Sequence, residues 1–356
     1  MRSWLKTAAL SLVEDAPVLV FLVVVLGASL VLPEIYPGPR FEVPQMAVMF
    51  SVQAVVSIAV GVCLAYPAIW LLRRIRSGGE GGSGWGQFVD RYLSTRQVVG
   101  IFVVMLWWTL FVTAFDTVKS YIPIVFSFRW DEALMEIDRV VHGGHHPWRL
   151  LFGFMNGSTT TVLVDKFYFS WYTYLLLVLM LHAWSPERKH RFRFLVSFAA
   201  VWVLLGNLMA AAASSAGPIY FDRVTDYQGN PYSALLAHLE AVHATDGLHA
   251  MAIRDQLWAN FQTERGFGAI AAMPSVHVAV AVLGALSAQA VDRRLGVLGW
   301  LYAAGVLVGS VYLGWHYALD GYVAILATVL IYRAAGPVTD AYWRKVVDPA
   351  RQRLSV

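Results

Sequence analysis

Long apolar runs that carry almost no charge dominate this sequence, and they limit the possible folds more than any other feature. Of the 356 residues, 58% are hydrophobic and only 14% are charged, whereas soluble domains have about a quarter charged residues. A run of roughly 17–25 apolar residues crosses a bilayer as a helix, because lipid offers no partner for unpaired backbone groups. The sequence therefore predicts an all-α, polytopic membrane protein.

The apolar runs predict about eight spans of the length that a bilayer requires. An N-terminal pair of spans precedes a Gly-rich stretch, SGGEGGSGWG, which is typical of a flexible linker. The later spans form a six-helix core. The predicted spans are Ala16–Pro33, Met46–Leu72, Val98–Phe115, Phe167–Trp184, Phe194–Ala213, Pro274–Ala290, Leu295–Gly314 and His316–Ala335.

Two long connections interrupt the core, at residues 116–166 and 214–273. Long connections in compact proteins are often functional. Both contain apolar and aromatic residues, so we predict short helices that lie on the membrane surface. The predicted parts of the chain are the N-terminal helix pair (residues 1–76), the linker (77–96), the core (97–338) and a tail (339–356).

The distribution of basic residues predicts the orientation. With the N-terminus inside, most of the 27 Lys and Arg residues fall in inside segments, as the positive-inside rule requires. We therefore predict a plasma-membrane protein with cytoplasmic termini and extracytoplasmic long connections. The first apolar run also resembles a secretory signal peptide, but Glu14 and Asp15 interrupt its start and no clear cleavage site follows. We interpret it as a retained transmembrane helix.

Three ionisable residues lie at the ends of two predicted spans. His277 occurs in AAMPSVHVAV, and His316 and Asp320 occur in GWHYALDGY. The chain between the histidines is long enough for two crossings and a turn, so both should reach the same extracytoplasmic face. An ionisable residue inside a span is costly and usually functional. Asp320 follows His316 by four residues, so their side chains should meet on one helix.

These residue types suit nucleophilic catalysis at phosphorus. An imidazole nitrogen of His316 can attack, while Asp320 holds the other ring nitrogen and stabilises the developing charge. His277 can protonate the leaving oxygen, and such acid catalysis contributes roughly 10²–10⁴-fold. Ser275 and the amides at the same helix N-terminus suit a phosphate group. A purely structural role at the helix ends is the alternative.

The motifs Pro274-Ser275-x-His277 and His316-x-x-x-Asp320-Gly321 resemble those of the type 2 phosphatidic acid phosphatase superfamily. The chain is most similar to its inositol phosphotransferase branch, which includes inositol phosphorylceramide synthases of the aureobasidin-resistance type. The resemblance covers roughly Val98 to Ala335. It also rests on the segments Asp138-Arg139…Gly144…Pro147-Trp148 and Ala216-Gly217-Pro218.

The resemblance implies a role for each matched residue. His316 would be the nucleophile that forms a phosphohistidine, Asp320 its partner, His277 the general acid and Ser275 a phosphate contact. It also implies a six-helix core with the site at the outer membrane face, and chemistry that needs no metal or other cofactor.

The sequence departs from the superfamily at its cationic phosphate clamp. It contains no Arg-Pro dipeptide, and Gly309 and Ser310 stand where the signature has Ser-Arg. A transferred phosphoryl group still needs positive charge around it. The outside candidates are Arg223, Lys166, Arg139 and Arg265. Arg223 ranks first and Lys166 second, and these two complete the predicted phosphate-binding set.

We therefore predict a lipid phosphotransferase that moves a phospho-head group, with phosphoinositol as one candidate, from a phospholipid donor to a lipid hydroxyl. The main alternative is a lipid phosphate phosphatase with the same residues. A transporter that uses intramembrane charges for ion coupling is a lesser alternative. The predicted partners are membrane lipids and no nucleic acid. The sequence does not determine the oligomeric state.

Overall fold

The computed structural model describes residues 2–41, 48, 52, 94–263 and 269–355. Within these ranges the chain is helical, without a strand. Six helices are long and apolar enough to cross a membrane, and one further apolar helix, α16, is shorter. The predicted polytopic all-α fold is therefore confirmed. The predicted span Met46–Leu72 and most of the linker lie outside the described residues.

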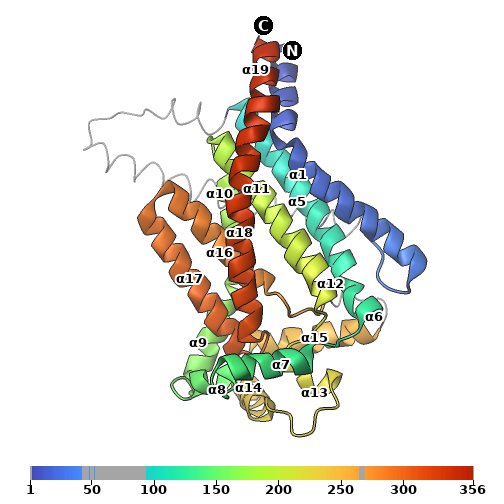
Figure 1. Ribbon diagram of the computed structural model, residues 1–356, viewed down its shortest axis with the longest axis vertical. Helices are drawn as coiled ribbons and strands as arrows, with labels where there is room; N and C mark the ends of the chain where they lie inside the picture. The colour runs from blue at the N-terminus through green and yellow to red at the C-terminus, as the bar shows by residue number, and fades with distance from the viewer. Residues whose placement is uncertain (1, 42–47, 49–51, 53–93, 264–268, 356) are drawn as a thin grey trace.

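The helix α16 (Val276–Val291) occupies the centre of the C-terminal half of the bundle (Figure 1). It packs against α17 (Arg293–Tyr312), α18 (Ala318–Tyr342) and α11 (Arg188–Val203). Glycine permits close approach of α17, because a Cβ at Gly299 would lie 2.7 Å from Cα of Ala285. The N-terminus of α16, which carries His277, is thus held by several neighbours.

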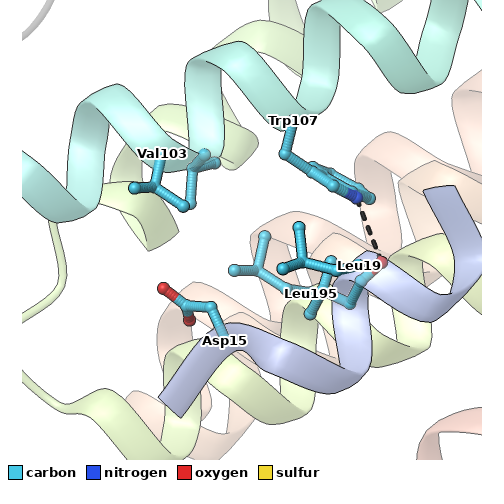
Figure 2. A pocket seen from close by; sticks show the side chains of 7 residues that line it. Asp15, Leu19, Val103, Trp107 and Leu195 are labelled. Atoms are coloured by element: carbon cyan, nitrogen blue, oxygen red, sulfur yellow. Dashed lines mark hydrogen bonds between the residues drawn. The ribbon is translucent and has the colours of Figure 1, made fainter. Parts of the chain in front are cut away.

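The N-terminal helix α1 (Arg2–Ile35) lies along α5 (Thr95–Ser120) and also contacts α11. A small cavity lies where the three helices meet, and Trp107 of α5 lines it (Figure 2). The Trp107 Nε1–H donates to the carbonyl oxygen of Val18 at 3.1 Å. This bond satisfies a buried indole that would otherwise lack a partner.

The two acidic residues that interrupt the first apolar run join α1 to the bundle. Asp15 forms a buried ion pair with Arg191 of α11. Glu14 accepts a hydrogen bond from Arg351 near the C-terminus at 2.8 Å. A buried charge is tolerated when a partner of opposite charge compensates for its lost hydration. These contacts hold α1 in one place along its neighbours.

Both long connections fold into short helices at one end of the bundle, and the two chain termini lie at the other end (Figure 1). The predicted short helices are therefore present. The first connection contains α6 (Ile122–Phe126), α7 (Asp131–Val141) and α8 (Pro147–Phe152), and the second contains η3 (Pro218–Tyr220), α13 (Phe221–Val224), α14 (Ser233–Asp246) and α15 (His249–Gln262).

Several helices extend beyond their predicted bounds. The span predicted to begin at Phe167 consists of α9 (Ser158–Phe169) and α10 (Trp171–Ala183), which meet at Ser170. The helix α18 continues through the π-helical turn η4 (Trp343–Val347) into α19 (Asp348–Ser355). Hydropathy detects only the apolar part of a helix, so polar helical ends were not predicted.

Candidate active site

His277 and His316 lie next to each other where the N-termini of α16 and α18 meet. Their ring centroids are 6.0 Å apart, in an edge-to-face arrangement. The backbone N–H of Ser275 donates to the carbonyl oxygen of Asp320 at 3.2 Å, which links the two helix starts directly. The structure therefore brings the two predicted site histidines to one face of the bundle.

The His316 ring is oriented by Asp320. Its Nδ1–H donates to Oδ2 of Asp320 at 3.2 Å, and the same oxygen accepts the Tyr317 N–H at 3.0 Å. The carboxylate is fully buried, and the imidazole is 5% exposed. Because an ionised carboxylate only accepts hydrogen bonds, this contact assigns a proton to Nδ1, and Nε2 is the ring nitrogen that Asp320 does not contact.

The prediction that His316 and Asp320 share one helix was wrong in detail. The helix α18 begins at Ala318, so His316 lies in the preceding turn, where its backbone N–H donates to the Ser310 carbonyl at 3.3 Å. The contact forms because an acidic residue in the first turn of a helix can reach back to the residues before it.

His277 lies in the first turn of α16 among aromatic side chains. The Trp171 Nε1–H donates to the His277 carbonyl at 2.9 Å, and the centroids of these two rings are 4.1 Å apart. The Tyr168 ring centroid lies 5.3 Å from that of His277. Trp171 and Tyr168 are both buried, whereas His277 is half-buried. This packing fixes the orientation of the imidazole.

Ser275, the predicted phosphate contact, is the N-cap of α16. Its Oγ accepts the N–H of Val278 at 3.4 Å, so the hydroxyl stabilises the helix start beside His277. The hydroxyl proton remains able to donate to an anion. Ser275 is fully buried.

Within the described ranges, none of the predicted cations contacts His277 or His316. Arg223 binds Asp255 at 3.3 Å and is partly buried. Lys166 is exposed on α9. Arg139 is paired with a carboxylate of its own helix. Arg265 lies outside the described residues. The phosphate-binding role of these four residues therefore stays a prediction.

Two carboxylates of α7 position the site, although only Asp138 was noticed in the sequence, as part of the family resemblance. Asp138 accepts the N–H groups of Ala318 at 3.1 Å and Leu319 at 3.0 Å, which are the first amides of α18. Burial raises the pKa of Asp138, while these two hydrogen bonds act in the opposite direction. Asp138 thus fixes the helix start next to His316.

Asp131 lies seven residues before Asp138 on the same face of α7. It holds the other side of the turn that precedes α18. It accepts the N–H groups of Ala216 and Gly217, each at 2.8 Å, and the hydroxyl of Tyr317 at 2.9 Å. Gly217 has φ +94°, and a Cβ there would lie 2.6 Å from the Trp315 carbonyl oxygen. Only glycine suits this position, which explains the Gly-Pro stretch.

The sequence did carry a signal for this arrangement. Asp131, Leu134, Met135 and Asp138 have the i, i+3, i+4, i+7 spacing of one helix face, and all four are buried. Acidic residues at both ends of an otherwise apolar face indicate that the face meets backbone amides, because a buried carboxylate needs donors.

Replacing Asp138 by Ala is expected to lower kcat by about 10²-fold with a smaller change in KM, since a displacement of roughly 1 Å at reacting groups has that effect. Removal of the carboxylate leaves the Ala318 and Leu319 amides without a partner. The measurement is steady-state turnover in detergent micelles. The matched control is Glu132→Gln on the exposed face of α7, and equal kcat values for both variants would contradict the positioning role.

Comparison with known families agrees with this geometry. A family model described as the PAP2 superfamily matches residues 132–334, which is more than half of the chain. The chain belongs to the PAP2 superfamily. This membership supports a lipid function of the phosphatase or phosphotransferase type in general. The PAP2 match covers α7 and both histidine motifs. Comparisons with curated proteins and with solved structures found no match.

Proposed function

We propose that this PAP2 protein transfers a phospho-head group from a phospholipid to a lipid hydroxyl through a phosphohistidine at His316. The supporting observation is the orientation of His316: Nδ1 donates to the buried Asp320, which leaves Nε2 as the ring nitrogen for attack, and the His277 ring centroid lies 6.0 Å away. An imidazole oriented in this way is ready to act as a nucleophile. Membership of the superfamily supports the general chemistry.

In the first step, Nε2 of His316 attacks the phosphorus of the donor phosphodiester. The new P–N bond forms as the bond from phosphorus to the glycerol oxygen breaks. Protonated His277 transfers its proton to that leaving oxygen, so that a neutral alcohol departs. Asp320 stabilises the positive charge that develops on the phosphorylated imidazole.

In the second step, His277 acts as a base. It accepts the proton of the acceptor hydroxyl as that oxygen attacks phosphorus, and the P–N bond breaks. His316 returns to its neutral state, and His277 is again protonated for the next cycle. The same two steps on a phosphomonoester lipid, with water in place of the lipid hydroxyl, release inorganic phosphate and describe a phosphatase.

Burial of the reacting groups favours a lipid acceptor over water. His316 is 5% exposed and Asp320 is fully buried, and the aromatic rings of Trp171 and Tyr168 flank His277. An apolar, water-poor environment protects a reactive phosphorylated intermediate from hydrolysis. The two long connections, which fold over this end of the bundle, provide surface for a second lipid substrate (Figure 1).

The deciding experiment uses the full chain in liposomes with head-group-labelled phosphatidylinositol, with and without ceramide or diacylglycerol as acceptor. We expect a labelled product lipid that appears only with an acceptor. Release of water-soluble labelled head group at the same rate with or without acceptor would contradict transfer and show hydrolysis instead, and release of inorganic phosphate from phosphatidic acid would support the phosphatase alternative. A His316→Asn variant provides the blank for both products.

A further inference from the structure

The proposed transfer requires a cation near the phosphoryl group, and the end of α5 provides one that the sequence did not indicate. Lys119 lies in the last turn of α5, where the helix dipole favours positive charge. Its Nζ lies 6.0 Å from the centroid of the Phe115 ring, one turn earlier. The side chain is half-buried. A lysine in such a place is costly without a function.

The end of α5 lies against the start of α16. The Phe115 ring and the Val276 side chain both contact Gly206 of the π-helical turn η2 (Leu204–Met209), because a Cβ at Gly206 would lie 2.7 Å and 3.2 Å from them. Val276 directly precedes His277. The Lys119 ammonium interacts electrostatically with the His277 ring. The end of α5, which carries Lys119, therefore packs beside the start of α16, which carries His277.

Lys119 differs from the cations predicted in the sequence in how its charge is balanced by nearby carboxylates. Asp116, three residues earlier, interacts with it electrostatically. Among the described residues, however, no carboxylate oxygen lies within ion-pair distance of Nζ. This distinguishes Lys119 from Arg223, which binds Asp255, and from Arg139, which binds Glu136.

The first turn of α16 offers hydrogen-bond donors beside this charge. Within the described part of the chain, the backbone N–H groups of Val276 and His277 have no hydrogen-bond partner. Free amides at a helix N-terminus bind phosphate oxygens well. A lysine that acts as a point charge beside such amides is a common way of holding a phosphate group.

We propose that Lys119 is the phosphate-binding cation of this protein and replaces the arginine clamp that its sequence lacks. The inference rests on the proposed phosphoryl transfer at His316. Lys119 and the Val276 and His277 amides would bind the non-bridging phosphoryl oxygens, so that charge is neutralised on the side of the leaving group.

The test compares Lys119→Met and Lys119→Arg with the unaltered protein in detergent, with orthovanadate and inorganic phosphate as probes. We expect Lys119→Met to weaken the affinity for both anions by about 10- to 100-fold, the effect of one lost charge-assisted contact. Lys119→Arg should recover most of that loss, because it keeps the charge. Calorimetric titration measures the affinities, and Lys345→Met, an exposed lysine in η4, is the matched control.

A second variant tests whether removal of a nearby negative charge raises the affinity for anions. Asp116→Asn removes the negative charge beside Lys119, so we expect tighter binding of both anions. Unchanged or weaker binding in this variant would overturn the inference, as would wild-type affinity in Lys119→Met. Because Asp116→Asn leaves Lys119 in place, it provides a test even if Lys119→Met does not fold.

The two proposals can fail separately. If the protein binds phosphate through Lys119 but transfers no head group between lipids, the proposed function is wrong and the cation site stands. If lipid transfer occurs and Lys119→Met keeps wild-type affinity for phosphate and vanadate, the cation inference is wrong and the proposed function stands.

Discussion

Replacing His316 by Asn is expected to abolish head-group transfer, with a loss in kcat of at least about 10⁴-fold, as found when a covalent nucleophile is removed. Asparagine keeps a polar side chain next to Asp320 but has no basic nitrogen that can attack phosphorus. The fold should persist, because the buried Asp320 still accepts the Tyr317 N–H. Turnover of labelled phospholipid in liposomes measures the loss.

A substrate with a good leaving group distinguishes the role of His316 from that of His277. With a nitrophenyl phosphodiester, departure of the leaving group needs no proton, so His277→Asn should retain formation of the labelled phosphoenzyme. His316→Asn should form none with any substrate. Labelling at the wild-type level in His316→Asn would sink the proposed mechanism, because the covalent intermediate would then lie elsewhere.

Replacing Arg191 by Met is expected to destabilise the protein by about 3–5 kcal/mol, because the buried Asp15 carboxylate then loses its ion pair with the guanidinium. The Arg191 side chain is fully buried, and the ion pair joins α1 to α11. The guanidinium also donates to the carbonyl oxygen of Gly100 on α5 at 3.3 Å. One substitution therefore weakens the contacts among α1, α5 and α11. The midpoint of thermal unfolding in detergent measures the effect.

The double variant Asp15→Asn with Arg191→Met tests whether the charge of Asp15 causes the loss of stability in Arg191→Met. Since neither residue then carries a charge, we expect it to recover most of the lost stability. The exposed Arg344→Met should leave the midpoint unchanged. If the double variant is as unstable as Arg191→Met alone, the loss arises from packing and not from the stranded carboxylate.

The pairing of His277 with His316 was predictable because it depends on a simple property of membrane proteins. Two consecutive crossings return the chain to the same face, so residues before the first and after the second must lie at one level. The positions of both residues at helix starts followed from the limits of the apolar runs. The detail that His316 precedes α18 did not follow, since hydropathy does not determine where a helix begins.

The partners of the α7 carboxylates and of Asp15 were not predictable from local patterns. Asp138 meets Ala318 across 180 positions of sequence, and Asp15 meets Arg191 across 176. Such contacts depend on which helix ends lie together. The role of Arg223 as a phosphate contact stays a prediction. Its ion pair with Asp255 is a contact that its position after the Gly-Pro stretch did not indicate.

The sequence by itself determined the membrane class, the approximate positions of the spans and the identity of the histidine pair. Each of these follows from the solvent that surrounds a single segment, since lipid requires apolar, internally hydrogen-bonded helices. Only the tertiary structure decided which buried carboxylates hold the turn before α18 and which helix ends pack around the histidine pair. Those contacts are set by the packing of the whole bundle, because a buried charge or amide takes the partner that its neighbouring helices supply.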